Sequence, residues 1–224
     1  MTDMPLVTVV LLTYERTEYA LRTIDAMRRN WLYSNTAWYV SDDGSRVAHI
    51  DAVLSALAGL TVWGHRSIRG SYGNSANHGW FASHEHGDLT LFLEDDWDLR
   101  APFDVTPYVQ LLSTHDNIGM VRLAHLPSNL NTRSVGYDGR MYLQMLAGQQ
   151  YAFSGNPALR HRRAREAWGA YPERLYPGDT ELAYDLQVQQ RGGPSIVWPL
   201  AVGEQGVFGH IGTVQSYKMP EATA

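Results

Sequence analysis

A short apolar segment that ends in three consecutive acidic residues constrains the fold of this chain more than any other feature. Leu89–Leu93 is typical of a buried strand, and Glu94, Asp95 and Asp96 follow it directly. Open α/β sheets bind ligands at the carboxyl ends of their strands, so we expect these carboxylates at a binding site. Three adjacent carboxylates repel one another, and a divalent cation is the simplest group that would compensate them. The alternative is an acidic turn on the surface.

Length and composition restrict the class of protein. The 224 residues suffice for one domain with a large core, and contents of 44% apolar and 11% aromatic residues are typical of a globular protein. Because there is no cysteine, Asp, Glu or His must bind any metal. No apolar run approaches the roughly 20 residues of a membrane span, and no signal peptide is evident, so we expect a soluble cytoplasmic protein. The net charge of -5 argues against a generally basic nucleic-acid binder.

The first part of the chain predicts a strand, a helix and a second strand. Leu6–Leu12 is a continuous apolar run, Tyr19–Asn30 has apolar residues at helical spacing, and Trp38–Ser41 is again strand-like. Such a unit forms a parallel, right-handed crossover, which brings the carboxyl ends of both strands to one edge of the sheet. Thr13 and the pair Asp42–Asp43 are therefore expected to be neighbours.

A glycine-rich polar loop follows a third predicted strand, Leu60–Trp63. The loop, Gly64–Gly73, contains Arg69 and leads through Asn74 into a helix that contains Asn77. A helix N-terminus that follows glycines and is flanked by arginines can bind a diphosphate, because free N–H groups and partial positive charge face the anion. The loop is neither a GxGxxG motif after the first strand nor a P-loop, which disfavours dinucleotide-dependent dehydrogenases and P-loop NTPases.

The second half of the chain alternates predicted elements with polar loops. We expect, in order, a helix over Asp104–Thr114, a strand over Ile118–Ala124, a hairpin around Tyr137–Arg140, a helix over Ala158–Trp168, a helix that begins at Asp179 or Thr180 and stops at Gly192–Gly193, and a strand over Ile196–Pro199. This alternation predicts an α/β fold.

Three motifs together resemble a known enzyme class. Asp42–Ser45 (Asp-Asp-Gly-Ser), Asn77–Gly79 (Asn-His-Gly) and Leu91–Asp96 (Leu-Phe-Leu-Glu-Asp-Asp) resemble GT-A glycosyltransferases and are close to glycosyltransferase family 2. The acidic triplet is similar to the EDD form of the DxD motif in N-acetylglucosaminyltransferases. The resemblance implies a single GT-A (Rossmann-like) domain over 1–224. Its mostly parallel central sheet would be flanked by helices, with a smaller mixed region on the acceptor side.

The resemblance also implies how a donor would bind. A nucleotide sugar, with a UDP-sugar favoured, is expected in the half formed by 1–100, and the acceptor in 101–224. Asp43 matches a carboxylate that hydrogen-bonds the base, while Glu15 stands where the family carries Asn. The expected donor-binding residues are Thr13, Glu15, Asp42, Asp43, Arg69, Asn74, Asn77 and Asp95. In the alternative interpretation, Asp42 only caps the helix over Val47–Leu57.

A metal site is implied at the acidic triplet. Asp96 matches the carboxylate that holds Mn2+ or Mg2+ against the pyrophosphate of the donor. His210 is similar to a C-terminal histidine that joins the metal and phosphates in many GT-A enzymes. An ordinary surface or core histidine is the alternative for His210.

Catalytic residues are implied at a later motif. Pro177–Leu186 is similar to the Glu-Asp-x-Asp/Glu-Leu motif of inverting members, in which the Asp is the general base. Gly178 stands where the first Glu is expected, so the motif is incomplete. Asp179 matches the base and Glu181 is the fallback; Asp179 can instead be a plain helix cap. Removal of a proton from an acceptor hydroxyl during attack on the anomeric carbon would invert the anomer in a single displacement, although retention stays open.

A tryptophan and an arginine-rich segment are candidates for binding the acceptor. Trp97 is either a platform for a sugar ring or a core residue, and Asn156 lies in a turn similar to the acceptor-side segment of family 2. Arg160, Arg162 and Arg163 form either a solvated helix face or a phosphate-contacting strip. The strip would favour DNA as the acceptor, for example a hydroxymethylated pyrimidine as in phage base-glucosylating enzymes. Alternatives are a cell-surface or small-molecule glycan, a sugar nucleotidyltransferase, or a noncatalytic nucleotide-sugar-binding module.

Overall fold

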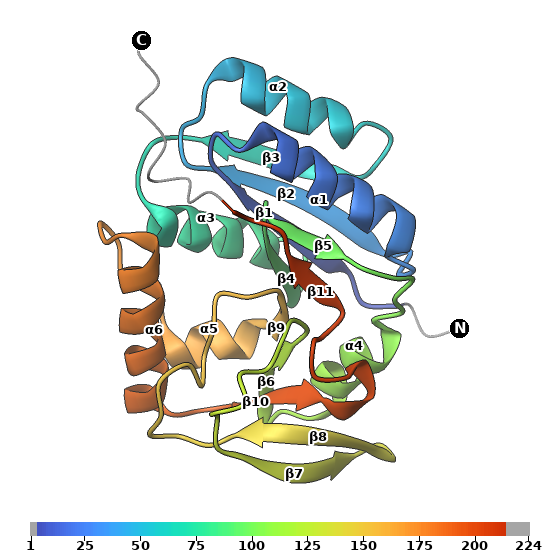
Figure 1. Cartoon of the computed structure of the whole chain (residues 1–224), viewed down its shortest axis with the longest axis vertical. Helices are drawn as coiled ribbons and strands as arrows, with labels where there is room; N and C mark the ends of the chain where they lie inside the picture. The colour runs from blue at the N-terminus through green and yellow to red at the C-terminus, as the bar shows by residue number, and fades with distance from the viewer. Residues whose placement is uncertain (1–3, 214–224) are drawn as a thin grey trace.

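The computed structural model describes residues 4–213. Within this range, nine strands form one sheet in the order β3-β2-β1-β4-β9-β6-β10-β8-β7, and β11 pairs with β5 in a separate two-stranded sheet (Figure 1). The strands are β1 Val7–Thr13, β2 Thr36–Asp42, β3 Val62–Ser67, β4 Leu89–Glu94, β5 Trp97–Leu99, β6 Ile118–Arg122, β7 Thr132–Tyr137, β8 Arg140–Met145, β9 Ala158–His161, β10 Ser195–Pro199 and β11 Phe208–His210. The helices are α1 Thr17–Asn30, α2 Val47–Ala56, α3 Tyr72–His84, α4 Thr106–Thr114, α5 Arg162–Trp168 and α6 Pro177–Arg191, with a short 3-10 turn, η1, at Leu200–Val202.

The first four strands of the chain form the parallel half of the large sheet. β1 lies between β2 and β4 and runs parallel to both, and β2 is parallel to β3. Successive side chains of a strand point to opposite faces. Accordingly, Val9 and Leu11 of β1 join one hydrophobic cluster and Val10 and Leu12 join the other. The predicted mixed α/β architecture with a mostly parallel central sheet is confirmed for this half.

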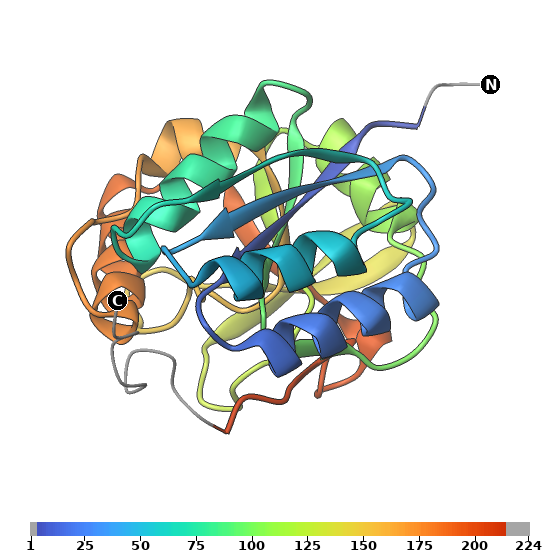
Figure 2. The same cartoon turned by 90° about the horizontal axis from the view of Figure 1, so that it is seen from above.

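Helices cover both faces of the sheet. Figure 2 shows α1 and α2 on one side of the parallel strands and α3 on the other. The cluster under α1 and α2 also receives side chains of α4, whereas the cluster under α3 receives side chains of α5 and α6. Among residues 4–213, no helix combines the length and the apolar character that a bilayer crossing requires.

The second half of the sheet is mixed. β9 is antiparallel to both β4 and β6, β10 is parallel to β6, and the hairpin of β7 and β8 packs antiparallel against β10. The predicted hairpin around Tyr137–Arg140 is thus confirmed. β9 joins the two halves, because it is the strand between β4 and β6.

Two sequence-based predictions of secondary structure are wrong in part. The predicted helix over Ala158–Trp168 is helical only from Arg162, because Ala158–His161 forms β9 in the middle of the sheet. Pairing with two neighbouring strands overrides the local helical preference there. The third strand was predicted over Leu60–Trp63 but covers Val62–Ser67, so the first part of the predicted glycine-rich loop is strand.

Candidate functional site

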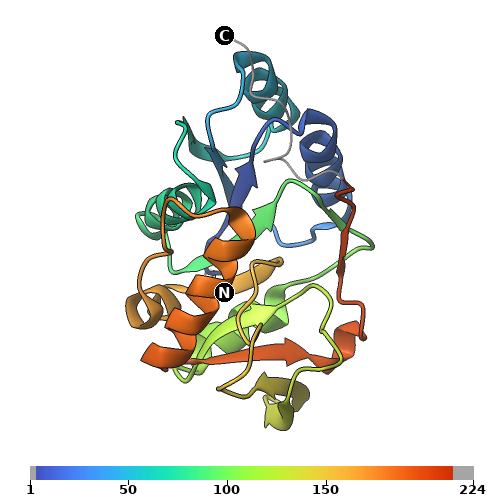
Figure 3. The same cartoon turned by 60° about the vertical axis from the view of Figure 1, so that its left-hand side comes forward.

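One large cavity opens at the carboxyl ends of β1, β2 and β4. Its volume is about 990 Å³. Residues of the first turns of α3 and α6 contribute to its lining. These two helices contact each other (Figure 3). It is lined by Leu12, Thr13, Tyr14, Arg16, Ser41, Asp43, Arg69, Gly70, Ser71, Tyr72, Ser75, Glu94, Asp95, Asp96, Arg174, Leu175, Tyr176, Pro177, Gly178, Asp179 and Glu181. We call this space the donor cavity, after the expected donor-binding residues Thr13, Asp43, Arg69 and Asp95 that line it.

One end of the donor cavity is built at the ends of β1 and β2. Thr13 pairs with Asp42 in the register of the two strands, and the backbone N–H of Asp43 donates to the Thr13 carbonyl at 3.1 Å. The predicted neighbourhood of Thr13 and Asp42–Asp43 is confirmed. The Asp43 carboxylate accepts from Gly70 N at 2.8 Å and lies 3.4 Å from Arg69 Nη1. Burial raises the pKa of Asp43, and the Arg69 charge opposes that effect.

Arg16 is the cation at the acidic tip of β4. Its guanidinium group is paired with the fully buried carboxylate of Asp95 and lies 2.6 Å from Asp96 Oδ2. Arg16 was not among the predicted site residues. The available signal was its position: it comes three residues after Thr13, at the edge of the sheet where the acidic tip also ends. The Arg16 side chain therefore compensates part of the negative charge for which the sequence predicted a divalent cation.

Burial and charge repulsion change the titration of this tip. Burial raises the pKa of Glu94 to about 8, and the negative charge of Asp96 adds to the effect. Burial raises the pKa of Asp95 to about 6, although the positive charge of Arg16 and hydrogen bonds from Thr13 and Tyr14 act in the opposite direction. The tip therefore carries less negative charge at neutral pH than its three carboxyl groups suggest.

The side chains around Asp96 provide some of the ligands that a divalent cation needs. Asp96 Oδ1 is buried and has no hydrogen-bond partner in the described part of the chain, and His210 Nε2 lies 3.2 Å from Asp96 Oδ2. A Cβ on Gly212 would overlap Asp96 Oδ2, so glycine keeps this space open. Within residues 4–213, no group of three or more His, Cys, Asp or Glu side chains could hold a metal alone. The pair Asp96 and His210 fits a metal whose remaining ligands come from a bound molecule.

A buried histidine supports the acidic tip from behind. Thr13 Oγ1 donates to Asp95 Oδ2 at 2.7 Å and lies 2.8 Å from His49 Nε2. A hydroxyl group has one proton, so Thr13 accepts a hydrogen bond from the Nε2–H of His49. Thr17 Oγ1 lies 2.9 Å from His49 Nδ1 and completes the contacts of the ring. His49 lies on the first turn of α2 and was not predicted as a site residue.

Four of the predicted donor-binding residues support the cavity without lining it. Asp42 is fully buried and accepts hydrogen bonds from the backbone N–H groups of Gly44 and Ser45 in the following turn; it does not cap α2, whose N-cap is Arg46. The Glu15 carboxylate binds Arg46. Asn74 and Asn77 both donate to the Glu173 carboxylate. In this structure these groups are bound to the protein itself, and their direct contact with a donor stays a prediction.

The two predicted catalytic carboxylates lie on the first turns of α6. Asp179 is exposed and lines the donor cavity, and the N-cap of the helix is Tyr176, so Asp179 is not the N-cap. Glu181 lies deeper, and its Oε1 accepts a hydrogen bond from Gly155 N at 2.7 Å. Asp179 is therefore the carboxylate of the two that faces the opening of the cavity.

The predicted acceptor residues lie outside the donor cavity. Trp97 is buried to 3% exposure because the pairing of β5 with β11 holds it in the core, which corrects the platform interpretation. Arg160 is fully buried among aromatic rings and bonds to the hydroxyl group of Tyr171, because β9 carries it into the middle of the sheet. Asn156 does not line the cavity.

The other two arginines of the predicted strip are also committed to internal contacts. Arg162 bonds to the carbonyl of His84 and forms an ion pair with Asp88 at 2.8 Å. Arg163 Nη1 donates to three backbone carbonyls at 2.9 Å. The segment is therefore not a continuous phosphate-contacting strip.

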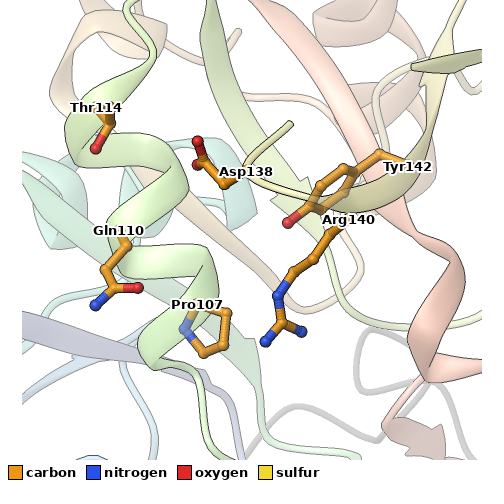
Figure 4. Close-up of a pocket in the computed structure, with 6 residues that line it drawn as sticks. All are labelled: Pro107, Gln110, Thr114, Asp138, Arg140 and Tyr142. Carbon is orange, nitrogen blue, oxygen red and sulfur yellow. The ribbon is translucent and has the colours of Figure 1, made fainter. Parts of the chain in front are cut away.

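A second, smaller cavity of about 420 Å³ lies between α4 and the β7–β8 hairpin. Figure 4 shows its lining residues as sticks: Pro107, Gln110 and Thr114 from α4, and Asp138, Arg140 and Tyr142 from the hairpin. None of the predicted site residues lines it.

Comparison with solved structures identifies the fold. A mannosyltransferase from Pyrobaculum calidifontis, in complex with GDP-Man and Mn2+, superposes with a TM-score of 0.63 at 16% identity over 88% of this chain and 55% of that chain. The chain has a GT-A-like fold. S. aureus TarS 1-349 in complex with UDP-GlcNAc gives a TM-score of 0.63 at 11% identity over 86% of this chain and 58% of that chain.

A mycobacterial protein gives a TM-score of 0.58 at 17% identity over 87% of this chain and 65% of that chain. The chain thus spans roughly half to two thirds of the length of these three structures. No protein-family model and no curated protein sequence matches the chain.

Proposed function

We propose that this protein is a glycosyltransferase of the GT-A type, similar to family 2, that moves a sugar from a nucleotide-sugar donor to an acceptor hydroxyl. One observation carries the proposal: Asp43 and Asp96 line the same cavity, at the ends of β2 and β4. One ligand could therefore place its nucleotide base at Asp43 and its diphosphate at Asp96. The shared fold supports it, because its representatives include complexes with GDP-Man and with UDP-GlcNAc.

The donor is proposed to bind across the strand ends. Asp43 would accept a hydrogen bond from the base, beside the Arg69 guanidinium, which lies 4.3 Å from the centre of the Tyr14 ring. The N-terminus of α3, after Gly70, provides N–H groups and partial positive charge for the diphosphate, and Arg16 provides a full positive charge. We favour a UDP-sugar as the donor.

Asp96 and His210 are the residues that would hold the metal. A bound Mn2+ or Mg2+ would neutralise charge on the departing diphosphate. Asp179 would take the proton of the acceptor hydroxyl while the hydroxyl oxygen forms the new bond to the anomeric carbon. The bond between that carbon and the diphosphate oxygen breaks, and the electron pair leaves with the diphosphate. A single displacement of this kind inverts the anomer.

A glycan or small-molecule acceptor is favoured over DNA. DNA was expected only from the arginine-rich segment, and Arg160, Arg162 and Arg163 are occupied by contacts within the protein. The mouth of the donor cavity instead contains Leu175 and Tyr176, whose side chains are exposed. Apolar and aromatic side chains suit the C–H faces of a sugar ring better than a phosphate backbone.

A thermal-shift panel tests the proposed function. UDP-sugars and GDP-sugars are added with and without Mn2+, and a ligand that binds only the folded state raises the melting temperature. We expect a nucleotide sugar with Mn2+ to give the largest rise, and Asp43→Asn to reduce it. Asp138→Asn, in the second cavity, is the control and should keep the full rise. A panel in which no nucleotide or nucleotide sugar raises the melting temperature would contradict the proposal.

A further inference from the structure

A histidine behind the donor cavity is connected to the cavity through one threonine. His49 is buried to 2% exposure and does not line the cavity. Its two ring nitrogens face two hydroxyl groups: Nε2 lies 2.8 Å from Thr13 Oγ1, and Nδ1 lies 2.9 Å from Thr17 Oγ1. Of these two threonines, Thr13 lines the cavity and Thr17 does not. Only the Nε2 side of the ring is therefore connected to the cavity.

The hydrogen bonds around His49 have one consistent direction. A carboxylate accepts hydrogen bonds, so the single proton of the Thr13 hydroxyl group goes to Asp95 Oδ2, 2.7 Å away. Nε2 of His49 then carries the hydrogen that Thr13 accepts, and Nδ1 accepts from the hydroxyl group of Thr17. Asp42 Oδ1 lies 3.9 Å from Nε2, and its negative charge favours a hydrogen on that nitrogen. Burial lowers the pKa of His49, which agrees with a neutral ring.

This series of hydrogen bonds ends at the groups that are proposed to hold the diphosphate and the metal. Thr13 binds one oxygen of Asp95, and the other oxygen pairs with the Arg16 guanidinium group. The same guanidinium group lies 2.6 Å from Asp96 Oδ2. Loss of the hydrogen on Nε2 of His49 would leave Thr13 Oγ1 without its donor. The threonine and the carboxylate that it binds would then no longer be held in one orientation.

We propose that His49 is a positioning residue for the diphosphate of the donor, which acts through Thr13 and Asp95 on the orientation of Arg16. This inference rests on the proposed function. His49 itself does not line the cavity, so its effect depends on the hydrogen that Nε2 donates. A substitution that keeps a donor at the place of Nε2 should preserve diphosphate binding. A substitution that removes this donor should weaken diphosphate binding, even where both disturb the core to the same extent.

Two amide variants separate the two ring nitrogens. The amide nitrogen of glutamine can take the place of Nε2, whereas the shorter asparagine side chain reaches only the place of Nδ1. His49→Gln therefore keeps a donor for Thr13, and His49→Asn loses this donor but keeps a polar group beside Thr17. Both variants place a neutral amide in the same buried space. Urea unfolding measures the stability of each and identifies a variant that is not folded.

Calorimetric titration in Mn2+ with UMP, UDP, GMP and GDP measures what the second phosphate contributes to binding. In the wild type, we expect one diphosphate to bind about tenfold or more tightly than its monophosphate. His49→Asn should lose most of this preference, while its affinity for the monophosphate changes by less than about twofold; His49→Gln should retain the preference. Arg29→Ala, which removes an exposed ion pair, is the control and should keep both affinities.

A double-mutant cycle tests whether His49 acts through Thr13. Thr13→Val replaces the hydroxyl group by a methyl group of similar size, and it should reduce the preference for the diphosphate as His49→Asn does. If the histidine acts through this hydroxyl group, His49→Asn should cause no further loss in a protein that already carries Thr13→Val. Thr13→Val also tests the same contact in case a His49 variant does not fold, because retention of the preference in this variant would contradict the proposal.

The outcomes distinguish this inference from the proposed function. If a diphosphate binds more tightly than its monophosphate and folded His49→Asn keeps that preference, the inference is wrong and the nucleotide site stands. Equal losses of the preference in His49→Asn and His49→Gln also overturn the inference, as do additive losses in the double mutant. A wild type that binds neither diphosphate better than its monophosphate has the same consequence. If no nucleotide binds at all, the proposed function itself is wrong, and the inference is wrong with it.

Discussion

Arg16 Nη1 lies 2.6 Å from Asp96 Oδ2, across the carboxyl ends of β1 and β4. The same guanidinium group is also paired with Asp95, and both carboxylates are at most 5% exposed. A positive charge from α1's N-terminal flank thus lies at the site where a donor diphosphate is proposed to bind. Because Asp96 Oδ1 has no partner among the described residues, the arginine and a metal ion can share this carboxylate.

Removal of the arginine charge is expected to destabilise the protein. In Arg16→Ala, two buried carboxylates lose their counter-charge, and the free energy of unfolding should fall by about 3 kcal/mol. Urea unfolding at pH 7 measures the change. Arg29→Ala is the matched control, because the ion pair of Arg29 with Asp25 is exposed and should contribute less than about 0.5 kcal/mol. Equal losses of unfolding free energy in the two variants would show that the ion pairs of Arg16 contribute no more to stability than an exposed ion pair.

Asp96 is expected to mediate the effect of the metal on donor binding. In Asp96→Asn, the affinity for the donor in Mn2+ should fall by about tenfold or more, which corresponds to about 1.4 kcal/mol. Removal of the metal with EDTA should weaken wild-type binding by a similar factor. Asp98→Asn is the control, because Asp98 pairs with Arg22 and does not line the cavity. Donor binding that is equally strong with EDTA and with Mn2+ would remove the metal from the proposal.

Asp179 is expected to affect the chemical step alone. Because its side chain is exposed, Asp179→Asn should unfold at the wild-type temperature and bind the donor with the wild-type affinity. Turnover should fall by about 100-fold to 10,000-fold, which is the usual contribution of a general base. Transfer assays with an excess of donor and acceptor measure this loss. A variant with wild-type turnover would exclude Asp179 as the base.

His84 predicts a dependence of stability on pH. Burial lowers the pKa of His84 to about 4, and the nearby charges of Arg162 and Arg165 add to the effect. Below pH 6.5 the unfolded chain binds a proton that the folded protein does not bind until about pH 4, so stability falls as the pH decreases through this window.

Urea unfolding at pH 7 and pH 5 measures the effect of His84. After allowance for the partial exposure of the ring, this histidine should account for about 1 kcal/mol of the unfolding free energy that is lost between pH 7 and pH 5. His84→Gln should lose less stability than the wild type over the same interval. Parallel losses in both proteins would show that the pKa of His84 is not lowered.

Local patterns in the sequence were sufficient for the parallel half of the fold. The apolar runs before Thr13 and Glu94, with a helix between successive strands, predict parallel strands whose carboxyl ends meet. The contact between Thr13 and the Asp42–Asp43 pair follows from this topology alone. The hairpin and the C-terminal ends of α4, α5 and α6 in the second half were also predictable, because turn residues and helical spacing are local properties.

Only the tertiary structure decided which partner each of the critical side chains meets. Ala158–His161 forms a strand because it pairs with β4 on one side and β6 on the other. This position buries Arg160, although the sequence pattern around it suggested an exposed basic helix. Trp97 enters the core for the same reason, since β11 pairs with its strand. Arg16 and Asp96 are eighty positions apart in the chain, and they come into contact because the sheet pairs β1 with β4. Spacing determines secondary structure, whereas packing between distant segments determines which charges are compensated and which remain available for a ligand.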